Sequence, residues 1–155
     1  NKNEYLRKSQ LFLNISLWVI IISCLLICLF AYPLIRYTYG FQYLAAVSIL
    51  QITIFKEIGY AFAQASGTMI ITEGIQKYVV LRNLIGCVIN IMLNLFLIPN
   101  LGVIGAAICS VITAFCTGYL AHAIIPIYRH IFKMQTRSIF IGWKDLIHVQ
   151  KLLKS

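Results

Sequence analysis

The residues of this sequence with the most chemical potential are polar side chains set inside long apolar stretches. Lys56 and Glu57 stand together in the middle of one such stretch. Adjacent residues on a helix point about 100° apart, so these two side chains need not pair with each other. A charge inside a membrane-spanning helix costs about 2.5–3.5 kcal/mol, and it needs a partner or a watery cavity. We therefore predict a cavity or an ion pair between helices for Lys56 and Glu57.

The polar character around these charges continues along the same predicted helix. Lys56, Tyr60 and Gln64 follow one another at four-residue spacing and share one helical face, and Glu57 lies on the next face. Because polar side chains disfavour contact with lipid tails, this helix is expected to face protein or water.

A second polar stripe lies in a later stretch, where Arg82, Gly86, Asn90 and Asn94 repeat every four residues. Asparagines at this spacing can form hydrogen bonds to a neighbouring helix, and they are more often packing contacts than ligand contacts. The long stem of Arg82 could reach the membrane surface, so a surface anchor and a cavity residue both remain open for it. The single His122 in the last stretch is expected to pack in the core or at an interface.

Helices must position these side chains, because four long apolar stretches make up most of the chain. Spanning the hydrocarbon core takes about 20 mostly apolar residues in a helix. Hydrophobic residues make up 61% of the chain and charged residues 11%, whereas soluble domains typically have about 25% charged residues. We predict an all-α membrane protein with four antiparallel transmembrane helices in residues 1–128 and a basic cytoplasmic tail in residues 129–155. The stretches run approximately over residues 11–35, 44–71, 78–98 and 102–128.

Positive charge is concentrated outside these stretches and mainly on one predicted side. The N-terminal arm, Lys77 and the tail are basic, and Arg36 is alone on the other side. Positive residues favour the cytoplasmic side, so we predict that both ends are cytoplasmic. A net charge of +9 can indicate nucleic-acid binding, but here contact with anionic membrane lipids is the simpler expectation. The tail is expected to form a helix on the inner surface or a loosely ordered polybasic segment.

The sequence gives no positive indication of an enzyme. It contains no HExxH, P-loop or Gly-x-Ser-x-Gly pattern, and it has four acidic residues in total. All five cysteines fall within apolar stretches, which does not indicate a disulfide framework. Cys24 and Cys28 are one helical turn apart, but no His or acidic residue in that stretch completes a metal site. We expect neither a metal nor another cofactor.

The segment from Gly86 to Ile112 contains the pattern Asn90, Asn94, Leu97-Ile98-Pro99, Gly102 and Gly105-Ala106-Ala107. This pattern resembles the C-terminal region of bacterial polysaccharide flippases. These proteins export O-antigen and capsule repeat units and belong to the multidrug/oligosaccharidyl-lipid/polysaccharide (MOP) superfamily. Weaker matches at residues 39–43 and 74–78 extend the resemblance to roughly residues 30–128, although Ile108-Cys109-Ser110 replaces the Ala-Thr that often follows in the family.

The resemblance implies a MATE-like transporter with two lobes, of which this chain supplies about the last four helices of the C-terminal lobe. An N-terminal lobe of the same protein would then be its partner. The implied function is flipping of undecaprenyl-pyrophosphate-linked oligosaccharide repeat units across the bacterial inner membrane by alternating access, for surface polysaccharide biosynthesis. Lys56 and Arg82 would attract phosphate. The expected donors in the cavity wall are Tyr60, Gln64, Asn90 and Asn94.

Two other functions remain open at this stage. A multidrug and toxin extruder with the same architecture would exchange cations for protons or sodium, and Glu57 is the candidate coupling residue. A small four-helix structural or regulatory membrane protein would need no further lobe. The first residue is Asn1, and we expect the chain to be the C-terminal part of a longer protein. The upstream reading frame would separate these hypotheses.

Overall fold

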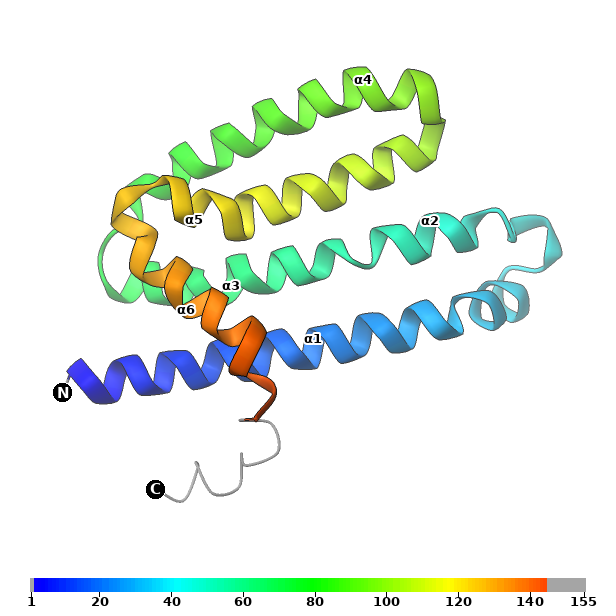
Figure 1. Cartoon of the computed structure of the whole chain (residues 1–155). Helices are drawn as coiled ribbons and strands as arrows, with labels where there is room; N and C mark the ends of the chain where they lie inside the picture. Colours follow the sequence, from blue (N-terminus) through cyan, green and yellow to red (C-terminus); the bar gives the residue numbers. More distant parts are fainter. Residues whose placement is uncertain (1, 145–155) are drawn as a thin grey trace.

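The part of the chain that the structure describes is almost entirely helical, and its long helices lie side by side (Figure 1). The computed structural model describes residues 2–144. Helix α1 (Lys2–Thr38) has 37 residues, which corresponds to about 56 Å at 1.5 Å per residue. It is therefore longer than the hydrocarbon core of about 30 Å. It begins before and ends after the predicted stretch, so the basic N-terminal arm is also helical.

The second predicted stretch, over residues 44–71, forms one membrane-length segment, Ala46–Thr72, with an irregular turn inside it. The short helix η1 (Phe41–Tyr43) precedes it, and the segment consists of α2 (Ala46–Thr53) and α3 (Lys56–Thr72). Between α2 and α3 the backbone hydrogen bonds join residues three apart instead of four. The amide of Phe55 donates to the carbonyl of Ile52, and the amide of Glu57 donates to that of Ile54. The thiol of Cys24 on α1 donates to the same Ile54 carbonyl at 3.4 Å. No glycine or proline marks this interruption in the sequence.

Helix α4 (Lys77–Phe115) covers the third stretch and most of the fourth, but it is folded back at Gly102. Gly102 has φ 58° and ψ −136°, a conformation that glycine tolerates because it lacks a Cβ atom. The two arms of α4, residues 77–101 and 103–115, lie next to each other (Figure 1). The turn predicted at Pro99–Gly102 is therefore the place where the helix reverses.

The last part of the bundle is made of short elements. The π-helix η2 (Cys116–Leu120) continues α4 and is followed by α5 (Ala121–Ile124), η3 (Pro126–Tyr128) and α6 (Arg129–Ile141). The predicted helix over residues 102–128 thus ends early. Ile125 adopts an extended conformation, with φ −79° and ψ 112°, because the residue before a proline is disfavoured in the helical region.

Helix α6 occupies the first half of the predicted tail and packs against α1. The side-chain amide of Gln10 donates to Ser138 Oγ at 2.8 Å and to the Met134 carbonyl at 3.0 Å. The indole of Trp18 donates to the Ser138 carbonyl at 3.0 Å. The rest of the predicted tail, residues 145–155, lies outside the described residues.

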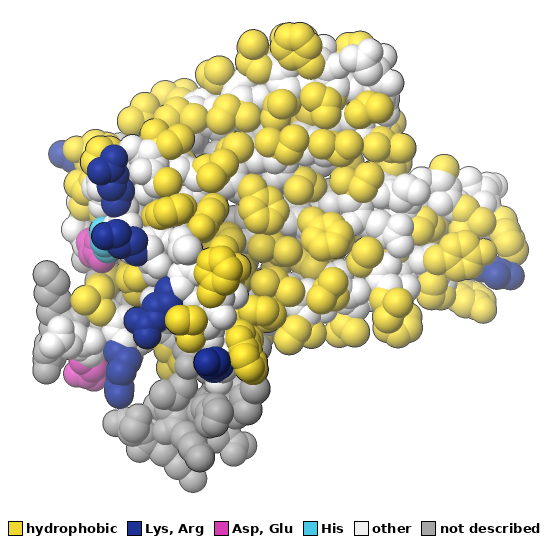
Figure 2. All heavy atoms as spheres, viewed as in Figure 1, with side chains coloured by type: hydrophobic (Ala, Val, Ile, Leu, Met, Phe, Trp, Pro, Cys, Tyr) yellow, Lys and Arg dark blue, Asp and Glu magenta, His cyan; other side chains and the backbone are white. Residues whose placement is uncertain are grey.

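The long helices present large apolar side chains to the outside. Leu29 is 73% exposed, and Leu95 is 68% exposed. Figure 2 shows such side chains over most of the visible face. Within residues 2–144, three helical segments are long and apolar enough to cross a membrane: Asn3–Thr38, Ala46–Thr72 and Lys77–Ile124. The chain therefore has the composition and helix lengths of a membrane protein.

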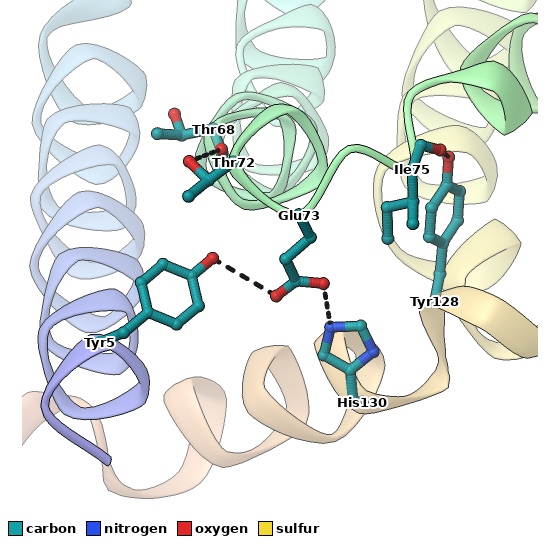
Figure 3. Close-up of polar contacts among 7 residues, drawn as sticks. All are labelled: Tyr5, Thr68, Thr72, Glu73, Ile75, Tyr128 and His130. Atoms are coloured by element: carbon teal, nitrogen blue, oxygen red, sulfur yellow. Dashed lines mark hydrogen bonds and ion pairs between the residues drawn. The ribbon is translucent and has the colours of Figure 1, made fainter. Parts of the chain in front are cut away.

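Basic side chains gather at the end of the bundle that holds the start of α1, the α3–α4 turn and α6 (Figure 2). At this end Glu73 joins three elements (Figure 3). Its Oε2 lies 2.9 Å from His130 Nε2 on α6, and its Oε1 accepts a hydrogen bond of 3.3 Å from the Tyr5 hydroxyl on α1. The Tyr128 hydroxyl donates to the Ile75 carbonyl at 3.1 Å. Arg36 lies in the last turn of α1, at the opposite end.

Candidate functional site

A groove of about 1230 Å³ opens between α1, α3 and both arms of α4. Its wall on α1 includes Ser16, the second arm of α4 contributes Thr113, and η2 contributes Thr117. Because polar side chains line a hollow among lipid-length helices, the groove is the natural place for a polar ligand inside this bundle.

Five of the seven site residues predicted from the sequence line this groove, namely Glu57, Tyr60, Gln64, Arg82 and Asn90. Lys56 and Asn94 do not line it. Lys56 is the first residue of α3, and the turn of about 100° per residue directs it away from the side chain of Glu57.

Arg82 is the most unusual of the groove residues. Its side chain is only 9% exposed, and its Nη1 lies 3.5 Å from Nε2 of His122 on α5. Within residues 2–144 its Nε has no hydrogen-bond partner and no carboxylate forms an ion pair with it. A buried guanidinium without a counter-charge is costly, so its remaining donors are available to an anionic group in the groove.

Among the described residues that line the groove, Glu57 supplies the carboxylate. The predicted ion pair between helices is not found for Lys56 or Glu57, because the ion pairs among residues 2–144 join Lys8 to Glu4 and His130 to Glu73. The alternative expectation, a cavity, matches the position of Glu57.

The two asparagines of the second stripe connect the arms of α4. Asn94 donates to Asn90 Oδ1 at 2.9 Å, and Asn90 donates to Thr113 Oγ1 at 3.1 Å. This is the packing role that was one of the two interpretations. Asn90 also borders the groove, so it can serve both roles.

Sequence reasoning missed several polar residues of this region. Asn83, Thr68 and Ser16 line the groove, although they were not among the predicted site residues. Asn83 directly follows Arg82, and Thr68 lies four residues after Gln64. His122 was assigned to packing, and its contact with Arg82 joins residues 40 positions apart. Such a contact has no signal in local spacing.

Gln135 on α6 was also missed, although its position gives a usable signal. It is fully buried and donates to Ser66 Oγ at 2.6 Å and to the Gly118 carbonyl at 3.0 Å. Ile131, Gln135 and Ser138 are the buried residues of α6, and their spacing of four and three marks one helical face. A glutamine on the buried face of an amphipathic helix indicates a buried acceptor.

Among the described residues, no group of three or more His, Cys, Asp or Glu side chains could hold a metal ion. The groove offers one cation, one carboxylate and several amides and hydroxyls. Such a set suits binding of a polar head group rather than ligation of a metal. Comparisons with protein-family models, curated proteins and solved structures each found no match to this chain.

Proposed function

We propose that this chain is part of a bacterial inner-membrane exporter that flips undecaprenyl-pyrophosphate-linked oligosaccharide repeat units for surface polysaccharide biosynthesis. The observation that carries the proposal is buried Arg82 in the wall of a polar groove among helices of membrane length. The sequence resemblance around Asn90, Asn94 and Pro99 supports the same assignment.

The chemistry of the head group explains why the groove would need these residues. A pyrophosphate is anionic and must cross hydrocarbon, so a cation in a hydrated path lowers the free energy of its transfer across the membrane. The planar fork of arginine matches phosphate oxygens, and Arg82 has no carboxylate partner in the described chain. Gln64, Asn83 and Tyr60 line the same groove and can bind sugar hydroxyls.

The proposal also assigns the chain a position within a larger transporter. In the proposal, α1, α3 and α4 form one side of a cavity, and an N-terminal lobe supplies the facing side. The two arms of α4 act as the third and fourth of four spans, and both ends of the chain are cytoplasmic. The basic end of the bundle (Figure 2) supports this orientation. A terminal tag that is labelled from outside intact cells would contradict it.

The test replaces Arg82 in the chromosomal gene of the source bacterium. Loss of a charge-assisted hydrogen bond costs about 1.5–3 kcal/mol, so Arg82→Gln should lower polymer export roughly 10- to 100-fold. Undecaprenyl-linked repeat units should accumulate in the inner leaflet. Arg82→Lys keeps the charge without the planar fork and should give an intermediate effect.

Arg36→Gln is the matched control, because it removes an exposed arginine at the opposite end of α1. It should leave surface polysaccharide unchanged. Normal polysaccharide in an Arg82→Gln strain with a normal amount of membrane-inserted protein would overturn the proposal.

A second function is favoured by one specific observation, the carboxylate of Glu57 in the groove. A cation extruder of the same architecture would use such a carboxylate to bind protons or sodium in exchange for drug. Glu57→Gln would then abolish drug resistance and leave surface polysaccharide intact. Lost polysaccharide with unchanged drug resistance would exclude the extruder.

A further inference from the structure

Three cations of α6 form one continuous surface, which we call the basic strip and define as Arg129, Lys133 and Arg137. They are four residues apart, so they lie above one another on one helical face. All three side chains are exposed, whereas Ile131, Gln135 and Ser138 on the same helix are buried. The protein therefore fixes one face of α6 and leaves the basic strip free for another partner.

The charge of the basic strip is not neutralised within the described chain. Among residues 2–144, two of the carboxylates are already paired, Glu4 with Lys8 and Glu73 with His130. Glu57 lines the groove instead. Arg129, Lys133 and Arg137 take part in none of the ion pairs of residues 2–144, so they present three uncompensated positive charges.

Large aromatic side chains adjoin the basic strip. Phe140 lies three residues after Arg137 and is 73% exposed, and Trp143, just past the end of α6, is 45% exposed. The Nζ atom of Lys144 lies 5.8 Å from the centre of the Trp143 ring. Exposed aromatic rings beside cations are typical of a helix lying at a membrane interface, and an acidic protein partner would not require them.

The position of α6 also favours a lipid partner. The helix starts five residues after the third membrane-length segment ends at Ile124. Its hydrogen bonds to Gln10 and Trp18 hold it against α1, which is itself long enough to span the bilayer. Figure 2 shows dark blue side chains over α6 beside apolar ones. The strip therefore lies at the level where the bundle leaves the hydrocarbon.

We propose that the basic strip binds the phosphates of anionic lipids in the adjoining leaflet, with Phe140 and Trp143 inserted between the head groups. Each strip cation contributes roughly fivefold to the local preference for anionic lipid. Gln135 on the opposite face of the same helix binds Ser66 of α3 and Gly118 of η2. Lipid bound to the basic strip thus stabilises the packing of α6 against α3 and η2, which lie behind the groove. This inference does not depend on what the groove transports.

The first experiment measures which lipid lies next to Trp143. The whole chain is placed in nanodiscs of phosphatidylcholine with a minority of phosphatidylglycerol, and bromine is carried either by one lipid or by the other. Quenching of Trp143 is obtained by subtracting the signal of a Trp143→Phe variant, which leaves Trp18. We expect quenching per mole of phosphatidylglycerol to exceed that of phosphatidylcholine several-fold.

Matched triple variants separate the basic strip from bulk charge. Arg129→Gln/Lys133→Gln/Arg137→Gln should abolish the excess quenching. Arg7→Gln/Lys8→Gln/Lys77→Gln removes three cations from the same end of the bundle (Figure 1) and should keep it. Equal quenching by both lipids in the unaltered chain, or equal loss in both triple variants, would overturn the proposal.

A second measurement tests whether lipid on the basic strip stabilises the protein. Phosphatidylglycerol should raise the thermal unfolding temperature of the unaltered chain and of the control triple variant, because a ligand that binds only the folded state stabilises it. The strip variant should unfold at the same temperature with and without phosphatidylglycerol. In pure phosphatidylcholine the unaltered chain and the strip variant should unfold alike, because the strip cations are exposed and form no ion pair within residues 2–144. An undiminished rise in the strip variant would contradict the inference.

Discussion

The side-chain amide of Gln135 on α6 donates a hydrogen bond of 3.0 Å to the carbonyl of Gly118 in the π-helix η2. A π-helix shifts backbone bonding by one residue and leaves a carbonyl without its usual partner. The same amide reaches Ser66 Oγ at 2.6 Å and the Phe62 carbonyl at 3.3 Å on α3. One side chain therefore joins three elements at the basic end of the bundle.

Replacing Gln135 with leucine should destabilise the bundle by about 1–3 kcal/mol, because buried acceptors on η2 and α3 lose their donor. The measurement is the free energy of unfolding in detergent micelles. Gln76→Leu is the control, because Gln76 is exposed in the α3–α4 turn. Equal stability of the two variants would show that the Gln135 contacts contribute nothing.

Alanine substitution at two glycines, Gly118 of η2 and Gly67 of α3, should change the stability of the protein in opposite directions. A Cβ atom on Gly118 would collide with the Gly59 carbonyl oxygen, and backbone atoms cannot move aside as a flexible side chain can. Gly118→Ala should therefore cost about 1–3 kcal/mol through overpacking. At Gly67, inside α3, a Cβ atom would meet nothing within 4 Å.

Gly67→Ala should leave stability unchanged or raise it by up to about 1 kcal/mol, since alanine has the higher helix propensity. Thermal unfolding of the two variants side by side checks both signs. A stable Gly118→Ala protein would mean that α3 and η2 do not approach as closely as described.

The reversal of α4 is held in part by the hydrogen bond from Asn90 to Thr113. A double-mutant cycle with Asn90→Ala and Thr113→Val should give a coupling energy of about 0.6 kcal/mol, the average for hydrogen bonds between membrane helices. The unfolding free energies of the two single variants and the double variant provide it. Asn100 forms its hydrogen bond to Phe96 of its own arm, so Asn100→Ala is the control. Its effect on the unfolding free energy should add to that of Thr113→Val without a coupling energy.

The sequence predicts the helical class and the helix reversal because both depend on local composition. Long apolar stretches leave a helix as the form that satisfies its own backbone, and Pro99 with Gly102 marks the reversal. The interruption between α2 and α3 has no such marker, since Ile54 and Phe55 are ordinary helix residues. It depends on packing against α1, where the Cys24 thiol meets the Ile54 carbonyl.

The candidate site, like the fold, could be predicted from the sequence only in part. Four-residue spacing placed Tyr60 with Gln64 and Arg82 with Asn90, and the structure places all four in one groove. Spacing within a helix cannot show which face meets a neighbour, and Lys56 is consequently off the groove. The contact of Arg82 with His122 depends on the fold of α4 and η2, which brings α5 beside the start of α4.

The contact between Glu73 and His130 gives the last prediction, because it ties α6 to the α3–α4 turn (Figure 3). The two side chains are 24% and 44% exposed, so screening by water limits the pair to about 0.2–1 kcal/mol. Glu73→Gln should lose the charge of this pair and still accept the hydrogen bond from Tyr5. Exchange of the α6 backbone amides with deuterium should therefore rise modestly, at about two- to fivefold. Glu4→Gln removes an exposed carboxylate that pairs with Lys8 on the same helix and should leave this exchange unchanged. Unaltered exchange in Glu73→Gln would show that Gln135 and Trp18 hold α6 without help from the ion pair.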